Sequence, residues 1–220
     1  MCGRFTIAIA VGWSDRFQVE GPFPPIQPHY NIAPTQMVPI IVHESPNCIV
    51  MMQWGLVPYW AKDPKIGSRM INARAETLAE KSAFRFPLQK HRCLVPATGF
   101  YEWKKTARGR VPYYLCLKDH SLFSFAGLYD HWRSPDGQNL TTFTIVTTEP
   151  NSLVNPLHDR MPAMLRREHE SLWLQPEPLS IDELYDVLKM YPEETMEAYQ
   201  VSSAVNTPAN DSEDLIKPIR

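Results

Sequence analysis

The chain has 220 residues, 44% of them hydrophobic, and a formal net charge of −2, which is typical of a globular protein with a sizeable core. No apolar run approaches about 18 residues and the N-terminus lacks the features of a secretory signal, so neither a membrane span nor export is expected. The four cysteines show no CxxC spacing, which indicates reduced thiols and a cytoplasmic protein.

The low net charge hides an asymmetry along the chain. Residues 61–118 carry thirteen Lys and Arg against four Asp and Glu, whereas the remainder is acidic. Such a segment can present a basic face to a polyanion. The alternative is a set of solvated lysines and arginines that never converge on one surface.

The predicted elements favour strands over helices, because the 21 prolines disfavour long helices in the first two thirds of the chain. Residues 30–34 predict a turn, residues 45–47 predict a hairpin turn, and residues 53–60 predict an ordered loop. Strands are expected, from β-branched and aromatic content, over residues 37–43, 48–54, 93–96, 99–104, 111–118, 122–129, 140–147 and 197–202.

Helices are expected mainly late in the chain. A short one is predicted over residues 12–18, helical composition follows Arg74, and a further helix is predicted over residues 166–174. Ser180 and Glu183 form a capping box that opens a helix to about Met190. The pattern predicts one α+β domain over residues 1–220, built on a curved, mostly antiparallel sheet or open barrel with peripheral helices. Its core spans about residues 2–205, and a polar tail that could be loose follows.

Cys2 is the first candidate for chemistry. If Met1 is removed, Cys2 carries a free α-amine and a thiol on adjacent carbons, with reference pKa values near about 7.7–8.0 and 8.5. The amine condenses with an aldehyde to an imine, and the thiol can close on it to give a thiazolidine. Arg4 adds a cation suited to phosphate or carboxylate. The alternative is that Cys2 merely precedes an ordinary first strand.

Glu102 and His158 are candidate acid–base groups. Glu102 lies in an aromatic strand, where desolvation would raise its pKa; alternatively it forms a surface pair with Lys104 or Lys105. His158 lies in a proline-bracketed loop, as site residues often do; alternatively Asp159 merely satisfies it in a turn.

Asn72 and Arg74 precede the expected helical run, where they could bind an anion or, for Asn72, cap the helix. Trp54 and Trp60 flank a loop and could stack on bases, although packing is the commoner role. The seven histidines are scattered and none is expected to pair with Cys at zinc spacing. We therefore expect neither a metal site nor a cofactor.

Six motifs in order carry a resemblance over residues 2 to about 205. They are MCGRF at 1–5, YNIAP at 30–34, WGLVP at 54–58, INARAE at 71–76, GFYEW at 99–103 and HDRMP at 158–162. On these motifs the chain resembles the SRAP family, the SOS response-associated peptidase-like proteins. The resemblance implies a single α+β domain around a barrel-like core, and a monomeric protein with no membrane partner, nucleoid-associated if prokaryotic.

The resemblance also implies a function in DNA repair, in which the protein binds single-stranded DNA and attaches covalently to abasic sites through a thiazolidine at the mature N-terminal cysteine. Matched motif by motif, Cys2 is the nucleophile, Asn72 the active-site asparagine, Glu102 the acid–base glutamate and His158 the catalytic histidine. The same matching implies that the residues contacting DNA are Arg4, Arg74 and Trp60.

Two other functions stay open on the sequence alone. One is a thiol peptidase or amidase with an N-terminal nucleophile, in which the α-amine of Cys2 acts as base and self-removal of Met1 is the minimal reaction. The other is a non-enzymatic DNA-binding module in which Cys2 is incidental and binding is simply sensitive to salt.

Overall fold

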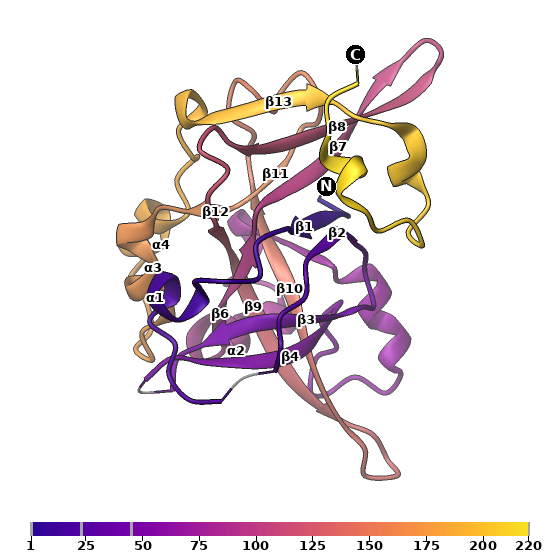
Figure 1. Cartoon of the computed structure of the whole chain (residues 1–220). Coiled ribbons are helices and arrows are strands. Elements are labelled where there is room, and N and C mark those ends of the chain that lie inside the picture. Colours follow the sequence, from indigo (N-terminus) through magenta and orange to yellow (C-terminus); the bar gives the residue numbers. More distant parts are fainter. Residues whose placement is uncertain (1, 23, 45, 220) are drawn as a thin grey trace.

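A closed five-stranded barrel forms the centre of the computed structural model, which describes residues 2–22, 24–44 and 46–219 (Figure 1). Around the barrel the strand order is β10–β4–β3–β6–β9, and β9 pairs back onto β10. The β10–β4 pair is parallel and the others are antiparallel. The barrel strands are β3 (Met37–Val42), β4 (Cys48–Trp54), β6 (Arg92–Ala97), β9 (Phe123–Arg133) and β10 (Asn139–Thr148).

A second, five-stranded sheet holds the N-terminus. Its order is β13–β8–β7–β1–β2, and its strands are β1 (Phe5–Ile7), β2 (His29–Ile32), β7 (Gly99–Thr106), β8 (Gly109–Leu117) and β13 (Met196–Gln200). Phe5 pairs with Phe100 on one side and with Ile32 on the other. The first strand, β1, therefore lies inside a sheet, between β7 and β2 (Figure 1).

Aromatic packing joins this sheet to the barrel. The ring of Phe5 lies 5.1 Å from that of Trp54 and 6.0 Å from that of Phe125, both edge to face. Trp54 in turn stacks on Phe143 at 6.3 Å. Buried aromatic pairs of this kind are worth about 0.5–1.5 kcal/mol beyond their area, so the first strand is fixed by the core of the barrel as well as by its hydrogen bonds.

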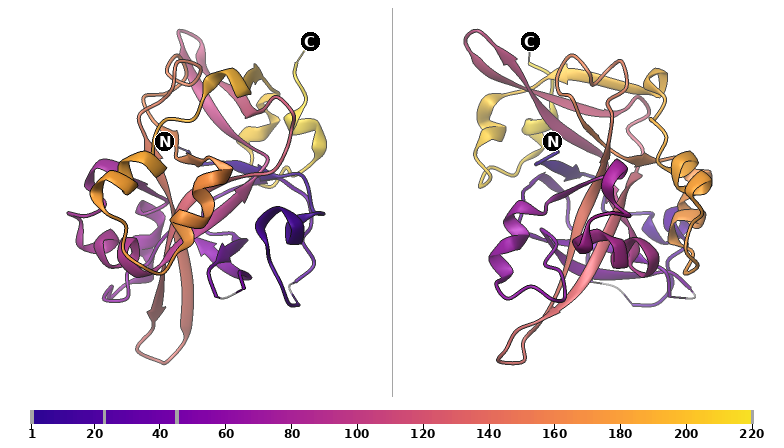
Figure 2. Two further views of the ribbon diagram at one scale, coloured as in Figure 1. Left: turned by 90° about the vertical axis from the view of Figure 1, so that its left-hand side faces the viewer. Right: turned by 180° about the vertical axis from the view of Figure 1, so that it is seen from behind.

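Short helices cover the outside. They are α1 (Trp13–Phe17), α2 (Ser82–Lys90), α3 (Arg167–Leu174) and α4 (Ile181–Val187), with 3-10 turns η1 (Pro64–Arg69), η2 (Ala75–Thr77), η3 (Glu193–Thr195), η4 (Ser203–Asn206) and η5 (Glu213–Ile216). Helices α3 and α4 lie side by side on one face (Figure 2). Arg16 links α1 to α3 through a bidentate pair with Glu170, at 2.6 and 2.8 Å. Among the described helices, no span is long and apolar enough to cross a membrane.

The structure confirms the predicted α+β fold on a mostly antiparallel barrel and most of the predicted elements. The capping box is present, with Ser180 Oγ accepting from the Glu183 backbone N–H at 3.2 Å, although α4 ends at Val187. Residues 30–34, predicted as a turn, begin within β2 instead. The predicted hairpin turn includes Ser45, which lies outside the described residues, as does Met1.

Two predictions are wrong. The helical run expected after Arg74 is only the single turn η2, because the chain enters it from a strand, residues 72–74, that is paired with β10. Helix α2 begins only at Ser82. The tail after Asn206 is not loose, because Leu215 is buried. The remaining short strands are β5 (Asn72–Arg74), which pairs parallel to β10, β11 (Met161–Pro162) and β12 (Met164–Leu165).

Two glycines cross where the loop after β4 leaves the barrel. A Cβ on Gly55 would lie 2.7 Å from the Gly67 oxygen, and one on Gly67 would lie 2.6 Å from the Gly55 oxygen. Gly55 also has a φ of +120°, which side chains rarely adopt. The close approach lets the Leu56 N–H donate to the Met70 oxygen at 3.1 Å, which brings the chain to β5.

We expect Gly55→Ala to destabilise the protein by about 2 kcal/mol more than Gly109→Ala, because only the first adds a backbone clash. Gly109 is a matched control, since its φ is +121° and nothing lies within 4 Å of its Cβ position. Urea unfolding of both variants measures the difference. Equal losses would show that backbone strain alone, and not the glycine crossing, requires Gly55.

Candidate active site

Cys2 and Asn72 meet where the two sheets come together. Cys2 precedes β1 and is fully buried. Asn72 begins β5, whose place is set by its parallel pairing with Ile145 of β10. The Asn72 Nδ2 donates to the Cys2 carbonyl oxygen at 2.8 Å. The prediction that Asn72 caps a helix is therefore wrong, because it lies in a strand and its amide binds the backbone of the N-terminal residues.

The thiol of Cys2 is held in its protonated form. Burial raises its pKa well above the ordinary value, and the nearby Glu102 carboxylate raises it further. Its Sγ lies 3.8 Å from the Arg4 carbonyl oxygen, as a weak donor. The charge of Glu102 thus acts on the Cys2 thiol, so the two predicted site residues are electrostatically coupled.

Glu102 is buried in β7, at 2% exposure. Desolvation raises its pKa to about 7, with a contribution from the charge of Asp159, while the Trp103 backbone N–H opposes the shift. The alternative of a surface pair with Lys104 or Lys105 is wrong, because the carboxyl does not reach the surface. A carboxyl with a pKa near neutrality can both donate and accept a proton under physiological conditions.

The strand alternation predicted around Glu102 is confirmed. Phe100 packs into the main core at 5.9 Å from Phe125. Tyr101 and Trp103 lie on the opposite face, 6.4 Å apart, in a separate cluster. The aromatic residues on both faces of β7 shield the strand from water, which explains why the carboxyl is desolvated.

His158 lies in the loop between β10 and β11. Its Nδ1 is 2.8 Å from the Asp159 carboxylate and 3.0 Å from the Arg160 backbone N–H. Its pKa is lowered first by burial and also by the charges of Lys105 and Arg110, against the opposing effect of Asp159. The Asp159 contact expected from the sequence is present, and the lowered pKa favours the neutral imidazole at pH 7.

Arg160 fixes the loop that carries His158. Its guanidinium binds the Glu76 carboxylate at 2.7 and 3.0 Å and the Thr147 carbonyl oxygen at 2.5 Å. These bonds join the loop to η2 and to β10. Bidentate Arg–carboxylate pairs are geometrically specific, so the position of His158 is set by both neighbouring segments.

Glu102 and His158 line one cavity of about 640 Å³, within the range typical of ligand sites. Lys105 and Arg110, from the β7–β8 hairpin, also line it. A hydrogen bond joins Cys2 to Asn72, electrostatics join Cys2 to Glu102, and the cavity joins Glu102 to His158. The structure thus gathers all four predicted catalytic residues at one site.

The Arg4 side chain is engaged in contacts within the protein, whereas the sequence predicted that it binds a DNA phosphate. Its Nη1 donates to Asn31 Oδ1 at 2.7 Å and to the Val205 carbonyl oxygen at 3.0 Å, and its guanidinium carbon lies 5.9 Å from the centre of the Trp103 ring. Burial lowers its pKa. Asn31 also donates to the Thr207 and Asn210 carbonyls, at 3.1 and 2.8 Å. Arg4 therefore connects the start of β1 to the C-terminal segment.

Comparisons with known proteins show the family to which the chain belongs. A family model described as SOS response associated peptidase (SRAP) matches residues 1–208. The chain belongs to the SRAP family. Among its relatives, Abasic site processing protein YoaM of Bacillus subtilis (strain 168) is 48% identical and covers 98% of this chain and 97% of its own length. Abasic site processing protein HMCES of Gallus gallus is 31% identical over 88% of this chain and 67% of its own.

Solved structures share the fold of this SRAP protein. A crystal structure of a protein from Bacteroides thetaiotaomicron has a TM-score of 0.90 and 31% identity and covers 100% of both chains. A second, from Bordetella bronchiseptica, has a TM-score of 0.76 at 22% identity and covers 91% of this chain and 100% of that one.

The two other residues predicted to contact DNA lie on the surface. Arg74 is exposed at the end of β5. Trp60 is 46% exposed and lines a second cavity with Lys62, Lys65 and Arg69. Trp54, by contrast, is fully buried and donates to the Ile71 carbonyl oxygen at 2.9 Å, so the suggestion that it stacks on bases is wrong.

Lys105 was expected only as a possible surface partner of Glu102, and Arg110 was not singled out. They belong to the basic segment 61–118, but charge counting could not say which members converge: Arg92, in the same segment, is buried and donates to the Trp173 carbonyl oxygen at 2.7 Å. The available signal was the hairpin itself. Strands 99–104 and 111–118 flank a short basic connection, and a hairpin brings its two strands together.

The raised pKa of Glu102 predicts a pH-dependent stability that Glu102→Gln removes. Because the folded-state pKa is about 7 and the unfolded value about 4.3, the folded state binds the extra proton between these values. Its contribution to stability is full below about pH 4 and is lost as pH rises to 7. Relative to the native chain, Glu102→Gln should gain up to about 3 kcal/mol between pH 4.5 and 8.

Urea unfolding at several pH values measures this gain, with Glu80→Gln, at an exposed position, as control. An unchanged pH profile in Glu102→Gln would contradict the assignment of the raised pKa to this carboxyl.

Proposed function

We propose that this protein processes abasic sites in single-stranded DNA, by forming a thiazolidine crosslink through Cys2 after removal of Met1. One observation carries the proposal: Cys2 is held by Asn72 next to a buried carboxyl, Glu102, whose pKa is about 7. The names of the relatives, abasic site processing proteins of bacteria and vertebrates, support the choice of substrate.

The reaction begins with the abasic sugar, which is mostly a closed hemiacetal. His158, kept neutral by burial and by two neighbouring cations, takes the proton of the hemiacetal hydroxyl and passes it to the ring oxygen as the bond from that oxygen to the anomeric carbon breaks. The sugar opens to the aldehyde, and His158 is neutral again. The α-amine of Cys2 then attacks the aldehyde carbon and forms a carbinolamine. Protonated Glu102 delivers a proton to the hydroxyl of the carbinolamine, which leaves as water and gives the iminium ion.

Closure of the thiazolidine ring uses the Glu102 carboxyl in its deprotonated form. Having lost its proton, Glu102 accepts the proton of the Cys2 thiol, and the sulfur attacks the imine carbon to close the five-membered ring. The raised pKa of the thiol means that the sulfur stays protonated until this step, so the amine reacts first. The net reaction joins amine, aldehyde and thiol and releases one water. It also diverts the imine from β-elimination, so that the DNA strand stays intact.

Asn72 is a positioning residue in this scheme. Its Nδ2 binds the Cys2 carbonyl oxygen, while its Oδ1 is buried and has no hydrogen-bond partner among the described residues. A buried, unmatched acceptor is costly. An N–H of the mature α-amine or of the carbinolamine is a suitable donor, and such a bond would hold the amine in line with the aldehyde.

Single-stranded DNA fits the surroundings of the site. Lys105 and Arg110 at the cavity supply positive charge for the phosphates on either side of the lesion. Exposed Trp60 beside Lys62 and Lys65 offers a ring on which an unpaired base can stack. An unpaired strand also lets the abasic sugar leave the backbone path and enter the cavity.

The family description names a peptidase, so the second candidate function is that of a thiol peptidase. A thiol peptidase needs a thiolate, whereas burial and Glu102 both raise the pKa of Cys2. The raised pKa of the thiol argues against general peptidase activity. It favours a reaction with an aldehyde, in which the α-amine of Cys2 attacks first. Turnover of unrelated peptides by the mature protein would reverse that preference.

The central test is crosslinking to a single-stranded oligonucleotide with one abasic site, followed on a denaturing gel. Mature protein should give a slow, stable band. Cys2→Ala should give no such band, and Glu102→Gln should slow its formation by about 10²–10⁴-fold, the usual contribution of a general acid–base group. Intact DNA and protein with Met1 retained are the controls, because a peptide bond at Cys2 removes the amine.

A stable crosslink formed by Cys2→Ala would contradict the mechanism. So would the lack of a band with wild-type protein whose Met1 has been shown by mass spectrometry to be absent.

The two arginines of the proposed DNA surface should behave differently. Arg74→Ala should weaken non-covalent binding and lower the salt slope by about 0.7, the value for one phosphate of a single strand, with little change in stability. Arg4→Ala should lower the urea midpoint, because Arg4 holds Asn31 and Val205. Binding measured at several salt concentrations, together with urea unfolding, separates the two. An unchanged midpoint in Arg4→Ala would assign Arg4 to DNA rather than to the fold.

A further inference from the structure

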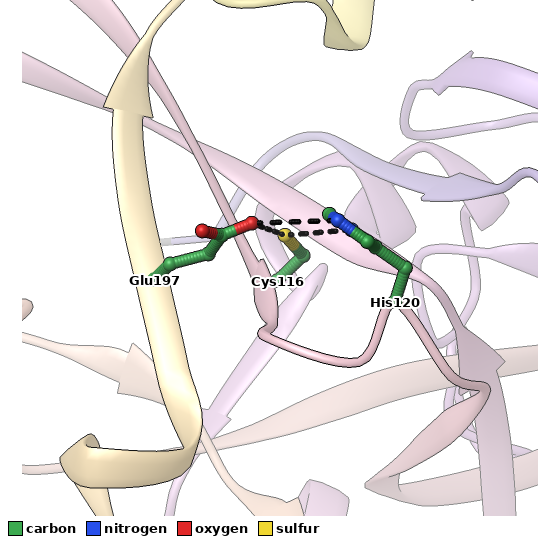
Figure 3. A group of neighbouring side chains, drawn as sticks. All are labelled: Cys116, His120 and Glu197. Atoms are coloured by element: carbon green, nitrogen blue, oxygen red, sulfur yellow. Dashed lines mark hydrogen bonds and ion pairs between the residues drawn. The ribbon is translucent and has the colours of Figure 1, made fainter.

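Three metal-binding side chains meet on the second sheet, away from the cavity of Glu102 and His158. Cys116 lies on β8, His120 lies in the turn that follows β8, and Glu197 lies on β13 (Figure 3). Glu197 is directly opposite Cys116 in the antiparallel β8–β13 pair. The Cys116 Sγ is 3.5 Å from Glu197 Oε1 and 3.7 Å from His120 Nδ1, and His120 Nε2 is 3.7 Å from Glu197 Oε1.

We propose that Cys116, His120 and Glu197 bind one zinc-class divalent cation. Thiolate, imidazole and carboxylate are the three side-chain donors of zinc sites. In a tetrahedral site with ordinary zinc–ligand bond lengths, neighbouring donor atoms lie about 3.4–3.6 Å apart. The separation of 3.5 Å between Cys116 Sγ and Glu197 Oε1 matches such an edge. The two 3.7 Å separations run to different nitrogens of His120, so the one nitrogen that binds the ion lies close to one partner and within 4.8 Å of the other.

The ring of His120 needs only a small adjustment to coordinate the ion. Its Nδ1 faces the sulfur and its Nε2 faces the carboxylate, so the edge between the two nitrogens is turned towards both partners. The side chain is 67% exposed and that of Glu197 is 37% exposed, which leaves room for the ring to rotate. A modest rotation directs one nitrogen at an ion placed between the three residues.

The exposure of the cluster provides a route for the ion. The sulfur is buried at the base, while His120 and Glu197 form the side towards solvent. An ion can therefore enter from solvent, displace the thiol proton into the water, and keep a water molecule as its fourth ligand. Three protein ligands with one open position is a recognised arrangement for zinc.

The backbone at His120 supports a specific role for this residue. Its φ is +54°, in the left-handed region that glycine adopts most easily. Its N–H donates to the Leu117 carbonyl oxygen at 2.9 Å, which closes the turn. This conformation brings the ring back over Cys116, although three residues separate Cys116 from His120 in the chain. The sequence analysis overlooked this pair, and the third donor could not be anticipated because it comes from β13.

A bound ion would tie β13 to β8. The segment after β13 carries Val205, whose carbonyl oxygen accepts from Arg4, and Asn206, whose Oδ1 accepts from Trp103 at 2.7 Å. The site would thus stabilise the part of the fold that holds the N-terminal strand without taking part in the crosslinking chemistry. The proposal does not depend on the proposed function.

The test is metal binding by the full chain in a Cys2→Ala background, because a mature N-terminal cysteine would itself chelate metals. Metal-free, reduced protein is titrated with Co²⁺ and with Zn²⁺ in competition with a chromophoric chelator. We expect one ion per chain, a thiolate-to-cobalt charge-transfer band and a higher melting temperature with Zn²⁺. His120→Asn and Glu197→Gln should each weaken binding at least by the roughly 10- to 100-fold that loss of an outer-shell partner costs.

His120→Asn is chosen because asparagine tolerates a positive φ, and both variants lie at solvent-accessible positions, so folding should be retained. Cys116→Ser should abolish the charge-transfer band. The matched controls are His43→Asn and Cys48→Ser, which remove the same donor types from the β3–β4 hairpin and should leave binding unchanged. Absence of the band in the Cys2→Ala chain, or its persistence in His120→Asn and Glu197→Gln, would overturn the proposal.

Discussion

The structure depends on holding the first strand in the middle of a sheet. A chain terminus usually frays unless it is tied down, yet Cys2 is fully buried. Two neighbouring strands supply hydrogen bonds to β1, and Phe5 lies against Trp54 and Phe125 in the core. Backbone pairing and aromatic burial together fix the position of Cys2 beside Asn72, as the proposed chemistry requires.

The same anchoring accounts for the C-terminal segment. Asn31 accepts from Arg4 and donates to three carbonyls of the segment that follows β13. Tyr101 donates to the Tyr30 carbonyl oxygen at 2.7 Å. These bonds satisfy buried polar groups on both sides of β1, so the two ends of the chain stabilise each other. Arg4 therefore stabilises the segments that hold Cys2 in place.

Burial also sets the proton chemistry. Glu102 is surrounded by the aromatic residues that make β7 a stable strand, and the desolvation that raises its pKa to about 7 is a consequence of that packing. The carboxyl in turn raises the pKa of the Cys2 thiol. A group that keeps a sulfur protonated, and that can itself take the proton, suits a sequence in which the amine reacts before the sulfur.

The sequence predicted the barrel strands and the capping box well, because both depend on residues close together in the chain: β-branched and aromatic residues for the strands, and Ser180 and Glu183 for the capping box. The prediction failed around Arg74: the alanine content that suggested a helix gives only the turn η2, and residues 72–74 pair with β10 as a strand. That pairing is what turns Asn72 from a helix cap into the partner of Cys2. Local patterns offered each residue of the site as one of two alternatives, and the family resemblance joined them; their spacing along the chain could not have assembled them.

Charge was the least informative local signal. The basic segment contains Arg92, which is buried to satisfy carbonyls near α3, as well as Lys105 and Arg110 at the cavity. The net charge of a segment does not tell which way its side chains point. The hairpin between β7 and β8 is what turns Lys105 and Arg110 towards Glu102 and His158. Their charges lower the pKa of His158, so groups suited to attract a phosphate also keep the neighbouring imidazole neutral and able to accept a proton.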